Sequence, residues 1–354
     1  MGLPQINIAF KTKAITAVQR SENGIVALIV VDTTKETASY TYAYAADINS
    51  EDWTAENLDL IKLAFLGAPR LVLVERISAI TDIANAFGRL KNKKWNWLAI
   101  AANAVPDEQI ESAYDWITEQ RAAAKTFKAV LPGTGETAMN NEGVVCFSTD
   151  GIVGSSKTYS TAAYCPRIAG ILAGLSMTVS ATYYVLSDVT SITESSTPDE
   201  DIDGGKMILI NDGEKIKIAS GNNSLHILEE GQSEEMKSIK TVEGMDLIRD
   251  DIRNTFEENY IGINNSYDNK TIFIGAVNEY FDELVRQGVL YDQYDNVCEI
   301  DIDAQREYLG SKYSVADMTD DQIKVAKTGK YVFAKADIQF CNAIENLDFS
   351  ITMS

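Results

Sequence analysis

The sequence predicts a multidomain protein in which an α/β part is followed by an α+β part. Three observations indicate this fold class. From residue 24 to residue 177, short apolar runs alternate with amphipathic segments, a pattern typical of a mainly parallel sheet covered by helices on both faces. Beyond residue 187 the pattern changes to a hairpin and two long amphipathic helices. Both ends of the chain are short segments in which apolar and polar residues alternate, as in half-buried strands.

In the α/β part, the expected strands are short, β-branched and bounded by turn residues. The elements predicted in chain order are strand 24–32, strand 39–44, helix 54–66, strand 70–75, helix 79–90, strand 97–101, helix 106–123, strands 127–131 and 144–148, and helix 168–177. Gly67 and Pro69 end the first helix, and Pro106 begins the third. In helix 168–177, Gly170 and Gly174 indicate close packing against a neighbouring element.

In the α+β part, we predict a hairpin of residues 206–210 and 215–219 around the turn Asn211-Asp212-Gly213. Helices 242–260 and 270–287 follow, and Gly288 ends the second. The expected division of the chain is an N-terminal arm (1–21), a small mixed α/β domain (22–90), a middle α/β domain (91–227), an α+β domain (228–335) and a C-terminal arm (336–354).

The two arms have the pattern of strands with one apolar face. The apolar positions are Leu3, Ile6, Ile8 and Phe10 in the first arm, and Leu347, Phe349, Ile351 and Met353 in the second. A further strand, with Val332 to Phe340 alternating, precedes the second set. The first twenty residues carry bases and no acid, whereas residues 336–354 carry acids and no base. Such strands either complete a sheet of their own chain or pair with neighbouring copies, and the pattern leaves both open.

Composition excludes several classes of function. The 31 basic and 52 acidic residues give a net charge of −21, which repels nucleic acid and anionic membranes. No run of eighteen uncharged apolar residues and no signal peptide occurs, so we expect a protein made and folded in a cytoplasm without membrane anchoring. The four cysteines lie far apart in the sequence, which predicts reduced structural thiols rather than disulfides or a zinc site.

An acidic stretch has part of the pattern of a calcium site. Asp199, Asp201 and Asp203 followed by Gly204 match the first half of a calcium-binding loop, but Ile210 stands where that loop requires a bidentate Glu. We therefore expect a solvated acidic turn and no metal.

A hydrolase is the alternative function, and it depends on the single histidine. A serine nucleophile needs an imidazole base and a group that orients it. His226 lies in residues 224–228, which alternate like a strand and not like the wall of a cleft. Gly133-Thr134-Gly135 lacks the third glycine of a dinucleotide fingerprint, and no phosphate-binding loop motif occurs. The sequence therefore predicts no catalytic residue and no cofactor.

Several segments, taken together, resemble contractile tail sheath proteins of phages and of R-type bacteriocins. These segments are Gly2-Leu3-Pro4 with Ile6 and Ile8, the run 20–28 (RSENGIVAL), the run 162–174 (AAYCPRIAGILAG), residues 205–225 ending in Asn-Ser-Leu, and residues 332–349 ending in AIENLDF. They occur in the family's order over nearly the whole chain, and they are similar to the short sheaths of Gram-positive phages and to the clostridial bacteriocin diffocin.

This resemblance implies a middle domain of subtilisin-like topology that is not a protease, and terminal arms that exchange strands with neighbouring subunits. It implies a structural subunit that polymerises around a tail tube and contracts to drive the tube through a cell envelope. The implied partners are other copies of the chain, the tube protein, and baseplate and tail-terminator proteins. The implied location is the bacterial cytoplasm during assembly, then a phage tail or a released bacteriocin particle.

Overall fold

The computed structural model describes residues 13, 15–134, 138–155 and 157–353. The chain forms two compact units. The change from the large unit to the small one, between Glu243 and Gly244, falls within one long helix. The large unit contains Gln19–Glu243 and the residues from Asn342 onward, and the small unit contains Gly244–Cys341 with the described residues that precede Gln19. The short helix α2 (Ala17–Ser21) spans the first change from one unit to the other.

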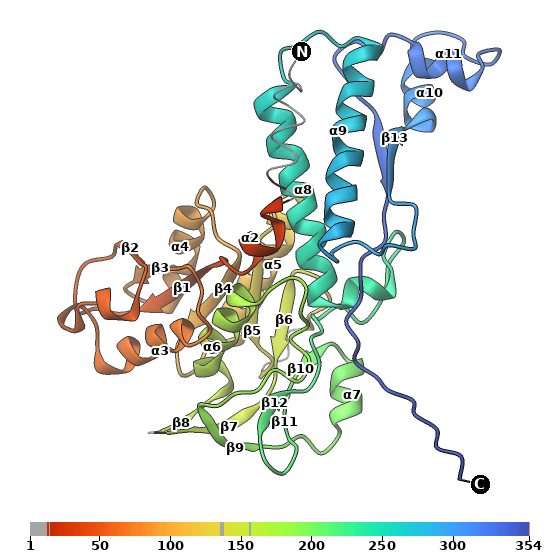
Figure 1. The fold of residues 1–354 in the computed structure, drawn as a ribbon. Helices are drawn as coiled ribbons and strands as arrows, with labels where there is room; N and C mark the ends of the chain where they lie inside the picture. The colour runs from red at the N-terminus through yellow and green to blue at the C-terminus, as the bar shows by residue number, and fades with distance from the viewer. Residues whose placement is uncertain (1–12, 14, 135–137, 156, 354) are drawn as a thin grey trace. The chain divides into compact units, whose positions relative to one another are not determined.

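A seven-stranded sheet is the centre of the large unit (Figure 1). Its order is β10-β6-β5-β4-β1-β3-β2, and every neighbouring pair is parallel except β2 with β3. The strands are β1 (Ile25–Val31), β2 (Ser39–Tyr42), β3 (Leu71–Ile77), β4 (Trp97–Ala101), β5 (Lys128–Pro132), β6 (Val144–Phe147) and β10 (Lys206–Met207). The predicted alternation of strands and helices is therefore confirmed as a mixed α/β fold.

Helices cover both faces of this sheet. They are α3 (Ala55–Phe65), α4 (Ile83–Leu90), α5 (Asp107–Ala122) and α6 (Thr161–Gly174). One apolar core joins α3 and α6 to one face, and a second core joins α4 and α5 to the other. The large unit is thus a three-layer structure, because each face of a parallel sheet is apolar and needs a cover.

Helices α3 and α6 touch through their backbones. A Cβ atom added at Gly170 would overlap the backbone oxygen of Ala64, and one added at Gly174 would overlap that of Gly67. The prediction that Gly170 and Gly174 serve close packing is therefore confirmed. The sequence placed the start of this helix too late: α6 begins at Thr161, where the Ser160 hydroxyl accepts a hydrogen bond from the backbone N–H of Ala163 at 3.2 Å.

The rest of the large unit consists of short antiparallel pieces. Strands β8, β7 and β9 form a small sheet that the sequence analysis did not predict. The predicted hairpin is confirmed as β11 paired with β12, with Gly213 at a φ of +94° in its turn. The bounds are β7 (Asp150–Gly154), β8 (Thr158–Tyr159), β9 (Val189–Thr193), α7 (Pro198–Asp203), β11 (Leu209–Asn211) and β12 (Ile216–Ile218), with short 3₁₀ turns η1 (Ala45–Asp47), η2 (Ser50–Asp52), η3 (Ile80–Asp82) and η4 (Glu234–Lys237).

The small unit is built on two long helices. These are α8 (Ile239–Asn259), which starts five residues before the unit boundary, and α9 (Tyr267–Arg286), which ends before Gly288 at a φ of +70°. Both predicted helices are confirmed within a few residues. The unit also contains β13 (Val297–Ile300), α10 (Ile302–Gly310), α11 (Asp320–Val325) and β14 (Ala334–Asp337). Its apolar core includes Phe273, Tyr280 and Phe281 of α9.

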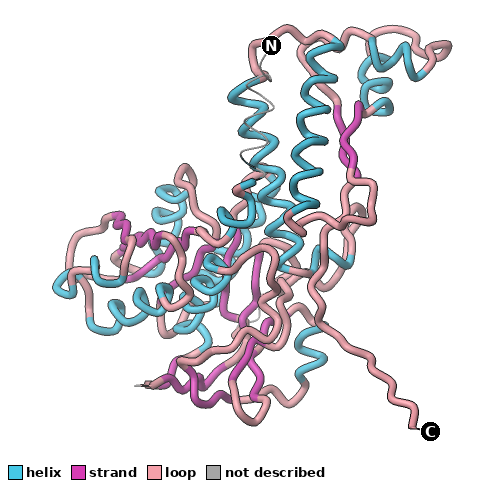
Figure 2. Tube along the Cα trace, in the orientation of Figure 1, coloured by secondary structure: helices cyan, strands magenta, loops and turns pink. Residues whose placement is uncertain are grey.

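The C-terminal segment differs from the sequence prediction. The expected strand 332–340 is shortened to β14, and all four of its residues are exposed rather than half buried. Residues 342–353 contain no strand (Figure 2). An extended segment counts as a strand only when a neighbour supplies hydrogen-bond partners, and within this chain no described segment lies alongside residues 346–353 as a strand. The predicted boundary at residue 90 falls inside the part of the chain that builds the large sheet, and the five-part division stays a prediction.

Candidate assembly surfaces

The C-terminal segment carries a row of exposed apolar side chains. Leu347 is 85% exposed, Phe349 73%, Ile351 76% and Met353 92%. They alternate with Asn346, Asp348, Ser350 and Thr352, so an extended backbone places them on one face. Figure 1 shows the dark blue end of the chain as an extended trace that leads away from the labelled elements. A row of this kind is a surface that a partner strand or groove can cover.

The base of this arm is attached to the large unit. The Glu345 carboxylate accepts hydrogen bonds from the hydroxyl groups of Ser180 and Thr182, each at 2.7 Å. Further back, the Asn342 amide donates to the Glu235 carboxylate at 3.4 Å. The attachment therefore ends at Glu345, immediately before the exposed apolar row begins.

The small unit offers a matching surface in its two-stranded sheet. β13 and β14 pair antiparallel, with Cys298 opposite Ala336 and Ile300 opposite Ala334. On the exposed side the Lys335 ammonium pairs with the Glu299 carboxylate at 3.2 Å. Since β14 has one neighbouring strand among the described residues, its outer edge retains backbone groups that an added strand can pair with.

The predicted N-terminal arm residues cannot be placed in the same way. Leu3, Ile6, Ile8 and Phe10 lie outside the described residues. Their assignment as assembly residues stays a prediction, and so does that of Leu347, Phe349, Ile351 and Met353.

His226 lies in a loop and not on the strand face that the sequence predicted. Its Nδ1 atom is 3.0 Å from the backbone oxygen of Ser224, and its backbone N–H donates to the Asn140 side chain at 2.8 Å. The nearest serine in sequence, Ser224, donates its hydroxyl to the backbone oxygen of Asn141 at 3.0 Å. No described hydrogen bond joins His226 to a serine hydroxyl or to a carboxylate. The triad that the hydrolase alternative requires is therefore not supported.

The acidic stretch is a short helix and not a turn. Asp199, Asp201 and Asp203 all belong to α7, which begins at Pro198. Asp201 accepts hydrogen bonds from Ser195 at 2.5 Å and from the Lys206 ammonium at 2.8 Å, and these two bonds lower its pKa. A helix turns about 100° per residue, so alternate carboxylates point to different sides and do not converge. The described residues contain no group of three or more His, Cys, Asp or Glu side chains that could hold a metal ion.

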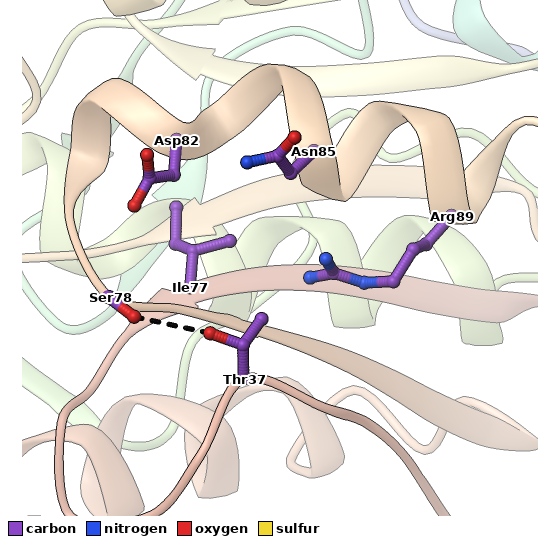
Figure 3. Close-up of a pocket in the computed structure, with 6 residues that line it drawn as sticks. All are labelled: Thr37, Ile77, Ser78, Asp82, Asn85 and Arg89. Atoms are coloured by element: carbon purple, nitrogen blue, oxygen red, sulfur yellow. Dashed lines mark hydrogen bonds between the residues drawn. The ribbon is translucent and has the colours of Figure 1, made fainter.

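A small surface pocket next to β3 has polar walls but is part of a structural cluster. It has a volume of about 330 Å³ and is lined by Thr37, Ile77, Ser78, Asp82, Asn85 and Arg89 (Figure 3). The Arg89 guanidinium donates to the Glu75 carboxylate at 2.5 Å and to the backbone oxygen of Arg76 at 3.0 Å. The one cationic group that lines the pocket is thus engaged by the protein's own carboxylate, which argues against an anion site.

Glu75 and Arg76, adjacent in β3, are the centres of two buried polar clusters that sequence reasoning missed, one on each face of the sheet, because successive side chains of a strand point to opposite faces. Both side chains are fully buried. Glu75 is bonded to Ser39, Arg89 and Lys93, with the Lys93 ammonium at 2.5 Å. Arg76 donates to the Tyr40 hydroxyl at 2.7 Å and lies over the Trp53 ring at 3.9 Å. The sequence feature that could have predicted this burial is the Glu-Arg pair within the apolar run of β3. Charged residues in a buried strand require partners around them, so the pair indicates a buried polar site.

Asp32 belongs to the cluster around Arg76. It is 97% buried, and its carboxylate is 3.9 Å from the Arg76 guanidinium. Burial alone would raise the pKa of Asp32, but hydrogen bonds from the Asn57 side chain, from the backbone of Thr54 and from Thr34 outweigh it and lower the pKa to about 2. The cluster around Glu75 therefore joins β2 and β3 to α4, and the cluster around Arg76 joins β2 and β3 to the end of β1.

Comparison with solved structures identifies the fold. The sheath tail protein Lin1278 of Listeria innocua is 13% identical with a TM-score of 0.72, over 84% of this chain and 93% of that one. The helical sheath of the anti-feeding prophage in its contracted state is 13% identical with a TM-score of 0.69, over 94% of both chains. The fold is therefore that of contractile sheath subunits.

Sequence comparison then gives the family. Residues 231–354 match the family model of the phage tail sheath C-terminal domain. A tail sheath protein of Clostridium phage phiCD119 is 33% identical over 365 aligned positions, which cover 99% of both chains. This chain belongs to the phage tail sheath protein family. None of the helices described here has the length and apolarity required to cross a membrane.

Proposed function

We propose that this sheath protein polymerises around a tail tube in an extended state and contracts to drive the tube through the envelope of a target cell. The family assignment supports this, and a protein of the same fold forms a helical sheath with a contracted state. The proposed partners are further copies of the chain, the tube protein, and baseplate and tail-terminator proteins. Assembly takes place in the bacterial cytoplasm, and the finished product is a phage tail or an R-type bacteriocin such as diffocin.

The observation that carries this proposal is the exposed apolar row from Leu347 to Met353. An apolar face that the chain itself leaves in water is stabilised when a neighbouring copy covers it. The open edge of β14 supplies the backbone partners, so strand addition between copies satisfies both surfaces. By the same reasoning, the N-terminal arm with Leu3, Ile6, Ile8 and Phe10 inserts into a neighbouring subunit.

The energetics favour assembly only when several contacts form together. An inserted arm gains about 1 kcal/mol per backbone hydrogen bond and about 1.5 to 3 kcal/mol per large apolar side chain that becomes buried. Ordering the arm costs about 1 to 2 kcal/mol per residue. These contributions nearly cancel for a single arm, so a lone subunit remains a monomer, whereas a subunit on a growing ring is held by several contacts.

Contraction then needs no nucleotide. Residues near 12–22 and 342–346 act as hinges, while the exchanged strands keep the subunits connected. The attachment of Glu345 to Ser180 and Thr182 supports a hinge at the base of the C-terminal arm, since the chain beyond it makes no described side-chain hydrogen bond. The two states are two packings of one polymer, and surfaces buried only in the contracted state drive the change.

We propose that residues 91–227 form a middle domain of subtilisin-like topology that performs no catalysis, as the family resemblance implies. The sheet of the large unit, to which this domain contributes β4, β5, β6 and β10, is doubly wound about β1, with β3 and β2 on the other side. The antiparallel β2 departs from a fully parallel arrangement. Within the described residues His226 makes no hydrogen bond to a serine hydroxyl or a carboxylate, and a similar fold does not by itself imply protease activity. The boundaries 1–21, 22–90, 91–227, 228–335 and 336–354 remain our proposed domain division.

Deleting each arm tests strand exchange. We expect chains that lack residues 1–11 or residues 346–354 to remain folded monomers that form no tubes. Electron microscopy beside the intact chain gives the result, and circular dichroism checks the fold. Sheaths of normal appearance from either deleted chain would overturn the proposal.

A further inference from the structure

A cavity of about 570 Å³ opens in the small unit where α8 ends and α9 begins. Its apolar wall includes Phe256, Tyr260 and Phe273, whose rings pack against one another at centroid distances of 4.9 to 5.8 Å. Ile263 and Val332 add to this wall. The cavity is large enough to receive one or two amino-acid side chains, and none of the assignments above uses it.

Polar groups without adequate partners line the same cavity. Lys270 is only 3% exposed, and its ammonium donates to the Thr328 hydroxyl at 2.8 Å; no ion pair joins it to a carboxylate among the described residues. Burial lowers the pKa of Lys270. The Tyr260 hydroxyl and the side-chain oxygen of Asn265 are buried with no hydrogen-bond partner in the described chain. Because a buried ammonium has three donors, this one can still bind an acceptor, and an anionic acceptor best offsets its burial.

The cavity adjoins the sheet edge that the arm is proposed to use. Gly329, Lys330 and Val332 line it, and β14 begins at Ala334, two residues after Val332. The four residues of β14 extend about 13 Å, whereas residues 347–353 of an extended arm reach about 23 Å. An arm paired along β14 therefore extends past the strand by several residues and can reach the cavity.

Charge selects which arm fits. The C-terminal arm from Asn342 onward carries Glu345 and Asp348 and no base. Glu345 is already bonded to Ser180 and Thr182, so Asp348 is the free carboxylate, and it is flanked by Leu347 and Phe349. The N-terminal residues 1–11 contain no acid and cannot supply an anion.

We propose that the cavity is the docking site for Asp348 of a second copy, with the Asp348 carboxylate bound to the Lys270 ammonium and a flanking apolar side chain packed on the Phe256, Tyr260 and Phe273 rings. This inference rests on the proposed strand exchange and names the residues that fix the register of the exchanged strand. A single buried ion pair at one end of the strand sets that register, because a shift by one residue would bury Leu347 or Phe349 against the ammonium.

The test is a double-mutant cycle on the full chain. The variants are Lys270→Met, which keeps the aliphatic stem and removes the charge, Asp348→Asn, and both together. Polymerisation is seeded with sheath fragments of the intact chain, and the critical concentration is measured by sedimentation. We expect each single variant to raise the critical concentration about tenfold, and the double variant to raise it no further, as a direct contact requires. Lys327→Met, an exposed lysine outside the cavity, is the matched control and should change nothing.

The outcomes separate this inference from the proposed function. Additive effects of the two substitutions, or no effect of either, would overturn the docking of Asp348 in the cavity. Strand exchange itself is tested separately, by whether the chain that lacks residues 346–354 polymerises. Normal polymerisation of that deleted chain would overturn both. Thermal unfolding of the monomers checks that the variants fold. We expect the Lys270→Met monomer to be at least as stable as the intact chain, because the substitution removes a buried charge that has one hydrogen-bond partner.

Discussion

Replacing Phe349 by Ala separates the stability of the subunit from the stability of the sheath. In the isolated chain this side chain is 73% exposed, so its removal changes the free energy of unfolding of the monomer by less than about 0.5 kcal/mol. In the polymer the exposed part becomes buried. Fully burying a Phe side chain contributes about 1.5 to 3 kcal/mol, and the remaining 73% of it contributes about 1 to 2 kcal/mol. Since about 1.4 kcal/mol corresponds to a factor of ten, we expect the critical concentration for seeded polymerisation to rise about 5- to 30-fold.

Ser350→Ala provides the matched control, because Ser350 alternates to the opposite face of the same arm. We expect it to leave the critical concentration unchanged within about twofold. The assay is sedimentation of the polymer over a series of protein concentrations, with electron microscopy of the pellet. Equal effects of the two substitutions would refute a one-sided buried arm. A drop in the thermal stability of the Phe349→Ala monomer would show that the arm is folded onto its own subunit.

Three further predictions concern the subunit itself. Gly170→Ala forces a methyl group against the Ala64 backbone, so we expect a loss of about 1 to 3 kcal/mol or more in urea unfolding, whereas Gly88→Ala, which has open space, has no such cost. The pKa of Asp32 is lowered from 3.8 to about 2, so its carboxylate stabilises the folded chain above pH 4, and this stabilisation is lost as the pH falls towards 2. In the Asp32→Asn variant, we expect the free energy of unfolding to fall by about 2 kcal/mol less over this pH range than in the intact chain, as measured by unfolding at a series of pH values. Glu345→Ala should leave the unfolding temperature unchanged but speed hydrogen exchange near Ser180 and Thr182, and unchanged exchange would contradict the attachment.

Local signals in the sequence were sufficient for most of the regular elements. Periodicity located α8 and α9 within a few residues, and the Asn-Asp-Gly turn located the β11–β12 hairpin. Gly170 and Gly174 indicated the close contact of α6 with a neighbouring element before its partner α3 was known. These features depend on residues that lie near one another in the chain, and so they can be read from a single sequence.

Other features depend on groups that are far apart in the chain. Sequence reasoning missed the burial of Glu75 and Arg76, because their partners Ser39, Tyr40 and Arg89 come from two other segments, β2 and α4. It treated Asp199, Asp201 and Asp203 as a turn, although Pro198 and three acids in a first turn are also a helix start. It assigned His226 to a strand, because alternation over five residues does not show whether a neighbouring strand is present.

The sequence by itself determined the alternating strands and helices of the large sheet, the two long helices α8 and α9, the acidic charge, the arms with their alternating apolar residues, and the resemblance that the comparisons confirmed as family membership. Only the tertiary structure decided that Leu347, Phe349 and Ile351 remain exposed in the single chain. It also decided that β14 is short and has one partner strand within the described ranges, and that Lys270 is buried with no ion pair to a carboxylate of those ranges. The physical reason is that periodicity specifies which side chains require burial, whereas the supply of a covering surface or a counter-charge depends on the whole folded chain.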